Sequence, residues 1–157
     1  MHQQQTQRIF RLMSGLWVGS LISIGFLVVP VLFSSFGDRQ VSGMIAASLF
    51  KSTAYIGVLI SVILMVMANH LVRLGNSQFR IARWLLLGML TCTVGAAFIL
   101  IPWMNSLRDQ ALYLGLSVRE SSNANLFCRL HGVSNVLFMI QSLLGLVLVW
   151  HATKNAD

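Results

Sequence analysis

Four long apolar runs, separated by short polar stretches, constrain this chain more than any other feature of its sequence. They cover residues 12–33, 44–72, 81–101 and 126–150. Each supplies the roughly 20 apolar residues that a helix needs to cross a hydrocarbon core of about 30 Å. Because a segment inside lipid must satisfy its own backbone hydrogen bonds, we expect four helices. The runs lack the apolar–polar alternation of a membrane barrel.

The connections between the runs predict how the helices are arranged. They are about 10, 8 and 24 residues long, and short connections make successive helices antiparallel neighbours. The sequence therefore predicts an all-α membrane protein, with four transmembrane helices in an up-down-up-down bundle that uses residues 1–157 as a single domain. Pro102 is expected to end the third span, and apolar residues at helical spacing predict a short surface helix over 107–118.

Charge is scarce, at 10% of the chain against roughly 25% in soluble domains. The net charge is +7, but the basic residues are spread between apolar runs and form no patch of the kind that binds nucleic acid. We therefore expect them to set the orientation of the helices and to contact anionic lipid headgroups, with membrane lipids as partners and no nucleic acid.

The positions of the cations predict that orientation. Six fall on one side of the expected bundle and five on the other: Arg8, Arg11, Arg73, Arg80, Arg83 and Lys154 against Arg39, Lys51, Arg108, Arg119 and Arg129. Since Lys51 and Arg129 lie within apolar runs, the first side has the larger share of loop charge. The positive-inside rule then places both termini in the cytoplasm of a bacterial inner membrane. The first run exceeds the roughly 7–15 residues of a signal-peptide core, so we expect it to be retained as a span.

Small residues predict faces where helices pack closely. The first span carries Gly15-x-x-x-Gly19 followed by Ser23, and the third carries Gly88, Cys92 and Gly95. Such stripes let helix backbones approach each other in lipid. We expect both to pack inside the bundle, with self-association as the alternative.

Polar residues inside the spans predict a site. Lys51, Arg129 and His131 are expected at one depth, in the outer third of the membrane, where an ionisable residue costs roughly 2.5–3.5 kcal/mol to insert. One interpretation is that the side chains extend to the headgroups, and the other is a shallow wet pocket for an anionic group. The fourth span also carries a polar face, consisting of His131, Ser134, Asn135, Gln141 and Ser142. The predicted ligand-binding residues are Lys51, Arg129, His131, Ser134 and Asn135.

Motifs for catalysis and cofactors do not appear. The chain has no nucleophile elbow, zinc-protease motif or phosphate loop. A haem between two histidines needs partners at equal depth, and only His70 with His151 meets that condition, at the membrane rim. We therefore predict no catalytic residue, metal or cofactor.

Three segments resemble the transmembrane protein 205-like family, a bacterial four-span membrane domain of unknown function. They are residues 16–19 with 25–33, residues 43–50 and residues 127–135. The shared elements are Trp-x-Gly…Pro-x-x-Phe and Leu-His-Gly-x-Ser, while Ala47 departs from an expected glycine. The resemblance implies a membrane protein without an assigned reaction. It also implies that six residues matter to the family: Pro30, Phe33, Arg129, His131, Gly132 and Ser134.

Three functions follow from these features. The first is a non-enzymatic bundle that binds a lipid or small anionic solute at the outer cluster and contributes to transport as an oligomer. The second is a structural or assembly subunit of a larger membrane complex. The third is a haem or metal electron carrier.

Overall fold

The computed structural model describes residues 2–118 and 120–154, which form helices joined by short connections and contain no strand. The elements are α1 (His2–Ser23), the π-helical segment η1 (Ile24–Val28), α2 (Val29–Ser35), α3 (Arg39–Arg73), α4 (Phe79–Val94), the π-helical segment η2 (Gly95–Leu100), α5 (Ile101–Tyr113) and α6 (Ala124–Thr153). Within the described residues they join into four continuous helical rods, each long and apolar enough to span a membrane: Gln3–Ser35, Arg39–Arg73, Phe79–Tyr113 and Ala124–Lys154.

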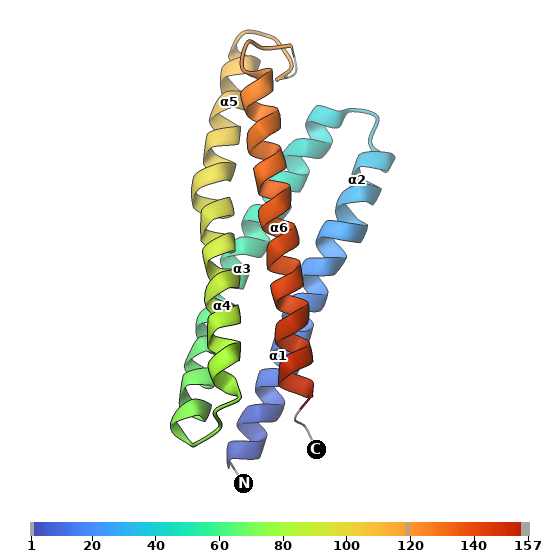
Figure 1. Ribbon diagram of the computed structural model, residues 1–157. Coiled ribbons are helices and arrows are strands. Elements are labelled where there is room, and N and C mark those ends of the chain that lie inside the picture. Colours follow the sequence, from blue (N-terminus) through green and yellow to red (C-terminus); the bar gives the residue numbers. More distant parts are fainter. Residues whose placement is uncertain (1, 119, 155–157) are drawn as a thin grey trace.

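Successive rods run antiparallel, and both chain ends lie at the same end of the bundle (Figure 1). The prediction of an all-α, four-span, up-down-up-down bundle is confirmed. We call the end with the termini and the 74–78 connection the terminal end. The distal end holds the 36–38 and 114–123 connections.

Two prolines lie in mid-rod without ending a helix. Pro30 is in the first turn of α2 directly after η1, and Pro102 is in the first turn of α5 directly after η2. Proline has no N–H to donate and collides with the carbonyl four residues earlier, whereas a π-helical turn changes the local hydrogen-bond register. The third rod therefore continues through Pro102 to Tyr113. The helix therefore does not end at Pro102 as we expected, and much of the predicted surface helix over 107–118 is the end of α5.

Two exposed tryptophans mark the depth of the bilayer along the third rod. Trp84 and Trp103 are 71% and 49% exposed, and tryptophan concentrates at membrane–water interfaces. Their 19-residue separation spans about 28 Å at 1.5 Å per residue, close to the thickness of a hydrocarbon core. On α6 the same spacing separates Trp150 from His131. His131 therefore lies at the level of Trp103, near the distal membrane boundary.

The terminal half of the bundle holds the larger core. Its buried residues come from all four rods: Phe10, Trp17, Val18, Leu21, Leu64, Ala68, Leu71, Phe79, Ala82, Leu86, Met89, Leu148 and Ala152. Phe10 and Phe79 meet edge-to-face with ring centroids 5.1 Å apart. Small residues admit large neighbours, since a Cβ added at Gly145 would lie 2.9 Å from Val18 Cγ2. Without a hydrophobic driving force between helices in lipid, this packing is what holds the rods together.

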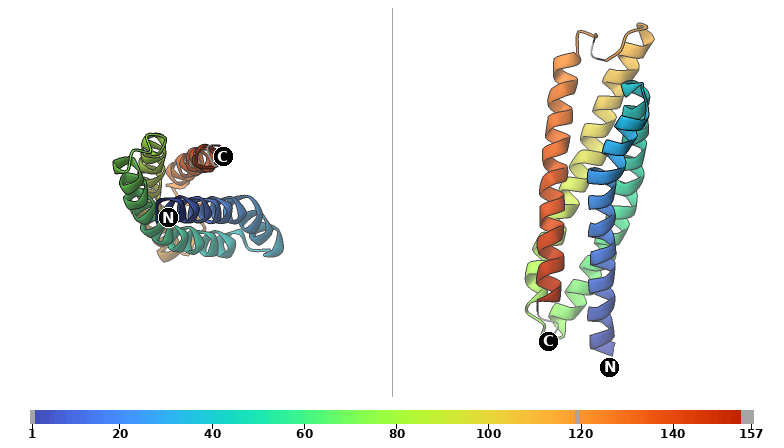
Figure 2. Two further views of the ribbon diagram at one scale, coloured as in Figure 1. Left: turned by 90° about the horizontal axis from the view of Figure 1, so that it is seen from below. Right: turned by 90° about the vertical axis from the view of Figure 1, so that its right-hand side faces the viewer.

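The distal half is more open. Neither η1 nor α2 buries a residue, and α2 with the start of α3 leans away from α5 and α6 (Figures 1 and 2). A smaller cluster joins η2, α5 and α6 there, made of Leu100, Ile101, Met104, Leu107 and Leu130.

The small-residue stripe of the first span does not lie where we expected. An added Cβ at Gly15 or Gly19 would meet no atom within 4 Å. The stripe lines an outward-facing hollow of about 480 Å³, formed by Gly15, Leu16, Gly19, Ser20, Ser23 and Ile24. Internal packing was therefore the wrong expectation for this stripe, because α1 turns Trp17 and Val18 inward instead. On the third span, Gly88 does face inward, with Leu144 Cδ1 3.1 Å from an added Cβ.

Candidate anion site at the distal end

The predicted site residues are distributed around the distal half rather than gathered at one point. Lys51 and Arg129 are exposed on α3 and α6. Arg129 and His131 are two residues apart on a helix, which separates them by about 200° around its axis. They therefore project to nearly opposite sides. Ser134 is half-buried and Asn135 exposed.

Arg108, which falls in the surface helix predicted over 107–118, is a cation that the structure brings toward the bundle interior. It is half-buried on α5, and its Nη1 donates a hydrogen bond to Asn105 Oδ1 at 3.1 Å. Its Cζ lies 5.9 Å from the centroid of the Phe127 ring on α6, within the range of a cation–π interaction. A Cβ added at Gly43 of α3 would lie 3.9 Å from Nη2. Arg108 thus reaches toward two other helices.

His131 joins this group through Phe127. The two rings stack with centroids 6.4 Å apart and planes 4° from parallel. We call Asn105, Arg108, Phe127 and His131 the distal cluster. Because Trp103 and His131 lie at one level, the cluster is at the depth of lipid headgroups.

Aromatic rings separate the distal cluster from the bundle interior. Phe138, about two turns from His131, lies 5.5 Å from Phe50 and 6.1 Å from Phe26 by ring centroids. Beyond it, Gln141 and Ser142 of the polar face are buried, at 6% and 4% exposure. Ser142 Oγ donates to the Phe138 carbonyl at 2.9 Å. The polar face of α6 is therefore continuous in sequence but is interrupted in space by an apolar layer.

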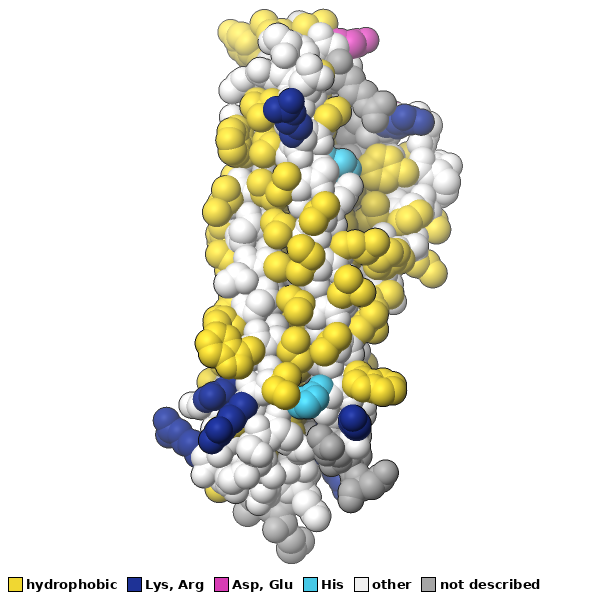
Figure 3. All heavy atoms as spheres, in the orientation of Figure 1, with side chains coloured by type: hydrophobic (Ala, Val, Ile, Leu, Met, Phe, Trp, Pro, Cys, Tyr) yellow, Lys and Arg dark blue, Asp and Glu magenta, His cyan; other side chains and the backbone are white. Residues whose placement is uncertain are grey.

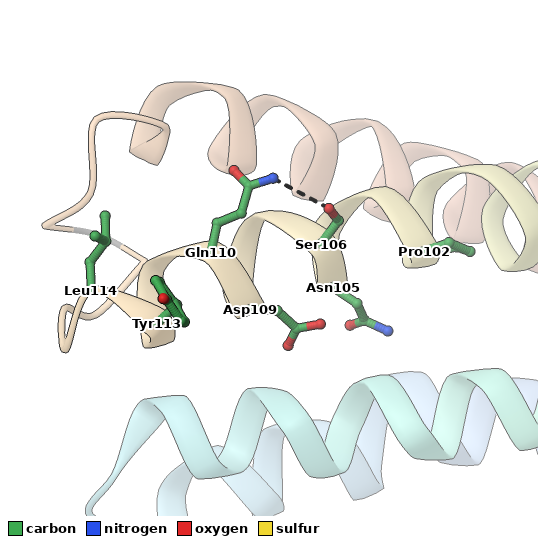
Figure 4. A pocket seen from close by; sticks show the side chains of 7 residues that line it. All are labelled: Pro102, Asn105, Ser106, Asp109, Gln110, Tyr113 and Leu114. Atoms are coloured by element: carbon green, nitrogen blue, oxygen red, sulfur yellow. Dashed lines mark hydrogen bonds between the residues drawn. The ribbon is translucent and has the colours of Figure 1, made fainter.

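A hollow of about 680 Å³ lies along the polar side of α5 (Figure 4). Its lining is Pro102, Asn105, Ser106, Asp109, Gln110, Tyr113 and Leu114. Asn105 and Asp109 project toward the ribbon of α3, while Gln110 Nε2 and Ser106 Oγ lie 3.5 Å apart (Figure 4). Asn105 connects this hollow to Arg108. The hollow offers hydrogen-bonding groups beside a cation at headgroup depth.

Among the described residues Arg108 forms no ion pair with a carboxylate, although Asp109 follows it in the chain. Asp38 is engaged elsewhere, since its Oδ1 caps α3 by accepting from the backbone N–H of Gln40 at 2.7 Å. The distal cluster therefore presents a positive group that contacts neutral polar and aromatic side chains and is attracted by the Asp109 carboxylate without a salt bridge among the described residues.

The histidines considered for haem lie at the terminal end. His151 Nε2 is 3.2 Å from the Gln78 carbonyl oxygen, and His70 is exposed near the end of α3. Within residues 2–118 and 120–154, no three His, Cys, Asp or Glu side chains are placed to hold a metal ion. Arg119, counted above among the distal cations, lies outside the described residues.

Fold and site together define an integral membrane protein with four spans. The chain belongs to the family described as a domain of unknown function, DUF4149, whose model matches residues 12–112. The matched segment contains Asn105 and Arg108 of the distal cluster and ends before Phe127 and His131. No match was found among curated proteins or among solved structures.

Proposed function

We propose that this protein is a non-enzymatic membrane protein that binds an anionic headgroup or small anionic solute at the distal cluster, and that this binding contributes to transport. We also propose that the chain is related to the transmembrane protein 205-like family. The proposal also includes a bacterial inner-membrane location with the terminal end in the cytoplasm.

One observation carries the proposal. The Arg108 guanidinium is half-buried beside Asn105 and Phe127 and is attracted by the neighbouring Asp109 carboxylate, but it forms no salt bridge among the described residues. Removing a charge from water is costly unless the charge is paired. An arginine has five N–H donors, and the bond to Asn105 is donated by one of them. An anion that enters the neighbouring hollow, which Asp109 also lines, would add negative charge beside Arg108 and accept hydrogen bonds from its remaining donors.

A binding experiment tests the proposal. Purified protein in a neutral detergent is titrated with short-chain phosphatidylglycerol or inorganic phosphate, and the thermal unfolding midpoint is recorded. We expect Arg108→Gln to abolish the stabilisation by the anion, and Arg129→Gln, on the opposite side of α6 from His131, to retain it. Arg108→Lys keeps the positive charge but removes the planar guanidinium with its paired N–H donors, so it distinguishes the contribution of charge from that of hydrogen-bond geometry. If Arg108→Gln folds and is stabilised by the anion as the wild type is, the proposal fails.

The alternative function is a structural or assembly subunit, and the exposed stripe of Gly15, Gly19 and Ser23 favours it. Close helix contacts in lipid use such stripes, and this one is uncovered. Gly19→Leu should then release a partner or second copy in mild detergent, whereas Gly37→Ala, in the 36–38 connection where an added Cβ meets nothing within 4 Å, should not. A wild-type chain that migrates as a lone monomer would remove this alternative.

The predicted orientation is tested with a native thiol. Cys128 is exposed near the distal end of α6, so a membrane-impermeant maleimide should label it from the periplasmic side of intact spheroplasts. Labelling only after the membrane is opened would reverse the orientation.

A further inference from the structure

Three arginines gather where α3 turns into α4, at the opposite end of the bundle from the distal cluster. Arg73 is the last residue of α3, and Arg80 and Arg83 lie in the first turns of α4. The turn between them is tight, with Asn76 N–H donating to the Leu71 carbonyl at 3.1 Å. Figure 3 shows Lys and Arg side chains concentrated over this hairpin, below a largely apolar band.

Asn69 and Arg73 of α3 lie beside Arg80 and Arg83 of α4 along the seam between the two helices, and we call this stretch of the seam the crevice. Arg83 Nη1 donates to Asn69 Oδ1 at 3.1 Å, which links α4 to α3. Asn69 and Arg73 are one turn apart on α3, as are Arg80 and Arg83 on α4, and residues so spaced share a helix face. The Asn69–Arg83 bond therefore brings the two basic faces together.

The charge of this crevice has no partner within the described chain. The acids of the described residues, Asp38, Asp109 and Glu120, all lie toward the distal end. Arg80 and Arg83 repel each other at their spacing. In the turn itself, the Asn76 Nδ2 donor is buried without an acceptor among the described residues. The crevice thus offers several donors and positive charges but no described carboxylate.

The depth of these arginines in the membrane indicates which group neutralises their charge. Trp84, 71% exposed, follows Arg83 and marks the terminal membrane boundary. A phosphate at this level belongs to a lipid headgroup, and arginine binds phosphate through paired N–H donors. We propose that the crevice formed by Asn69, Arg73, Arg80 and Arg83 is a binding site for the phosphodiester of an anionic phospholipid.

The test separates a specific site from a generally basic membrane end. Native mass spectrometry counts phosphatidylglycerol and phosphatidylcholine molecules retained by protein from mixed micelles. The variant Arg73→Gln/Arg80→Gln removes two charges from the crevice and leaves the Asn69–Arg83 bond in place. The matched control Arg8→Gln/Lys154→Gln removes two exposed charges from the same end, on α1 and α6. Circular dichroism in phosphatidylcholine confirms that both variants fold.

We expect the wild type to retain phosphatidylglycerol in preference to phosphatidylcholine. The crevice variant should weaken that retention about 25-fold, or fivefold per arginine, as expected for about 1 kcal/mol per basic residue at an anionic surface. The control should weaken it less than about twofold, because Arg8 and Lys154 lie on α1 and α6, outside the crevice, and would not bind the phosphate that the crevice holds. Equal loss in both variants, or no preference in the wild type, would overturn the proposal. Displacement of the lipid by millimolar inorganic phosphate would instead assign the crevice to a free anion and overturn the lipid assignment.

Discussion

The two halves of the bundle are built from the same kinds of residue but pack differently. In the terminal half, all four rods contribute to one buried cluster, and Leu64, Leu86 and Leu148 are fully buried. In the distal half, η1 and α2 bury nothing, and the buried residues of the smaller cluster come from η2, α5 and α6, with Phe50 of α3 packed against them. Apolar content therefore does not decide which half is packed.

The steric fit between the helices decides which half packs tightly. Gly57 faces Trp17 and Gly145 faces Val18 in the well-packed part of the bundle. The distal half has a close fit of this kind where Gly25 meets Phe138, but η1 still buries no residue. In the distal half, the first rod and α3 diverge from α5, and Arg108 with polar side chains occupies the region between them. The terminal half holds the larger buried core, and the distal half is the one in which we propose that an anion binds.

The largest expected difference in stability is between two leucine-to-alanine substitutions, one in each half of the bundle. Leu86→Ala should lower the free energy of unfolding by about 2–4 kcal/mol, because it leaves a cavity in the terminal core. Leu27→Ala should change it by less than about 0.5 kcal/mol, since Leu27 is 63% exposed in η1. Unfolding in mixed micelles with increasing SDS measures both. Similar losses would show that the distal half is packed as tightly as the terminal half.

A smaller difference is expected between two glycines. A Cβ at Gly57 would collide with the Trp17 indole, whereas one at Gly19 meets nothing within 4 Å. Gly57→Ala should therefore destabilise the fold by about 1–3 kcal/mol through overpacking. Gly19→Ala should stabilise it by up to about 1 kcal/mol through helix propensity. The same SDS titration reports both, and a loss of stability in Gly19→Ala would indicate that a partner covers α1.

The smallest effect concerns the distal connection. Hydrogen bonds from the Ser117 hydroxyl and backbone N–H hold the pKa of Glu120 below its ordinary value of 4.5. Their contribution is present at neutral pH and is lost as the pH falls through this lowered pKa. In an NMR titration, Ser117→Ala should move the midpoint of Glu120 upward. An unchanged midpoint would mean that the hydroxyl bond does not form in solution.

Hydropathy was sufficient to predict the four spans, because length and apolar content are local properties of the sequence. The continuation of the helix through Pro102 could not be predicted from the sequence, because the π-helical segment that accommodates this proline depends on the hydrogen-bond register of the folded backbone. That error placed Arg108 in a separate surface helix and left it out of the predicted site. The separation of Arg129 from His131, in contrast, follows from helix periodicity and was available from the sequence. Which face of α1 meets its neighbours is decided by tertiary packing, so the stripe at Gly15 was misassigned.

Hydrogen–deuterium exchange in nanodiscs tests the contrast between the halves most directly. Amides in 24–50 should exchange at least about tenfold faster than those in 60–90, because regions with few buried contacts open at lower cost. Adding phosphatidylglycerol should slow exchange around Arg108 and Phe127 in the wild type and have no such effect in Arg108→Gln. Uniform protection along the bundle, or slowing that is unchanged in Arg108→Gln, would contradict a distal half that is open and binds an anion at Arg108.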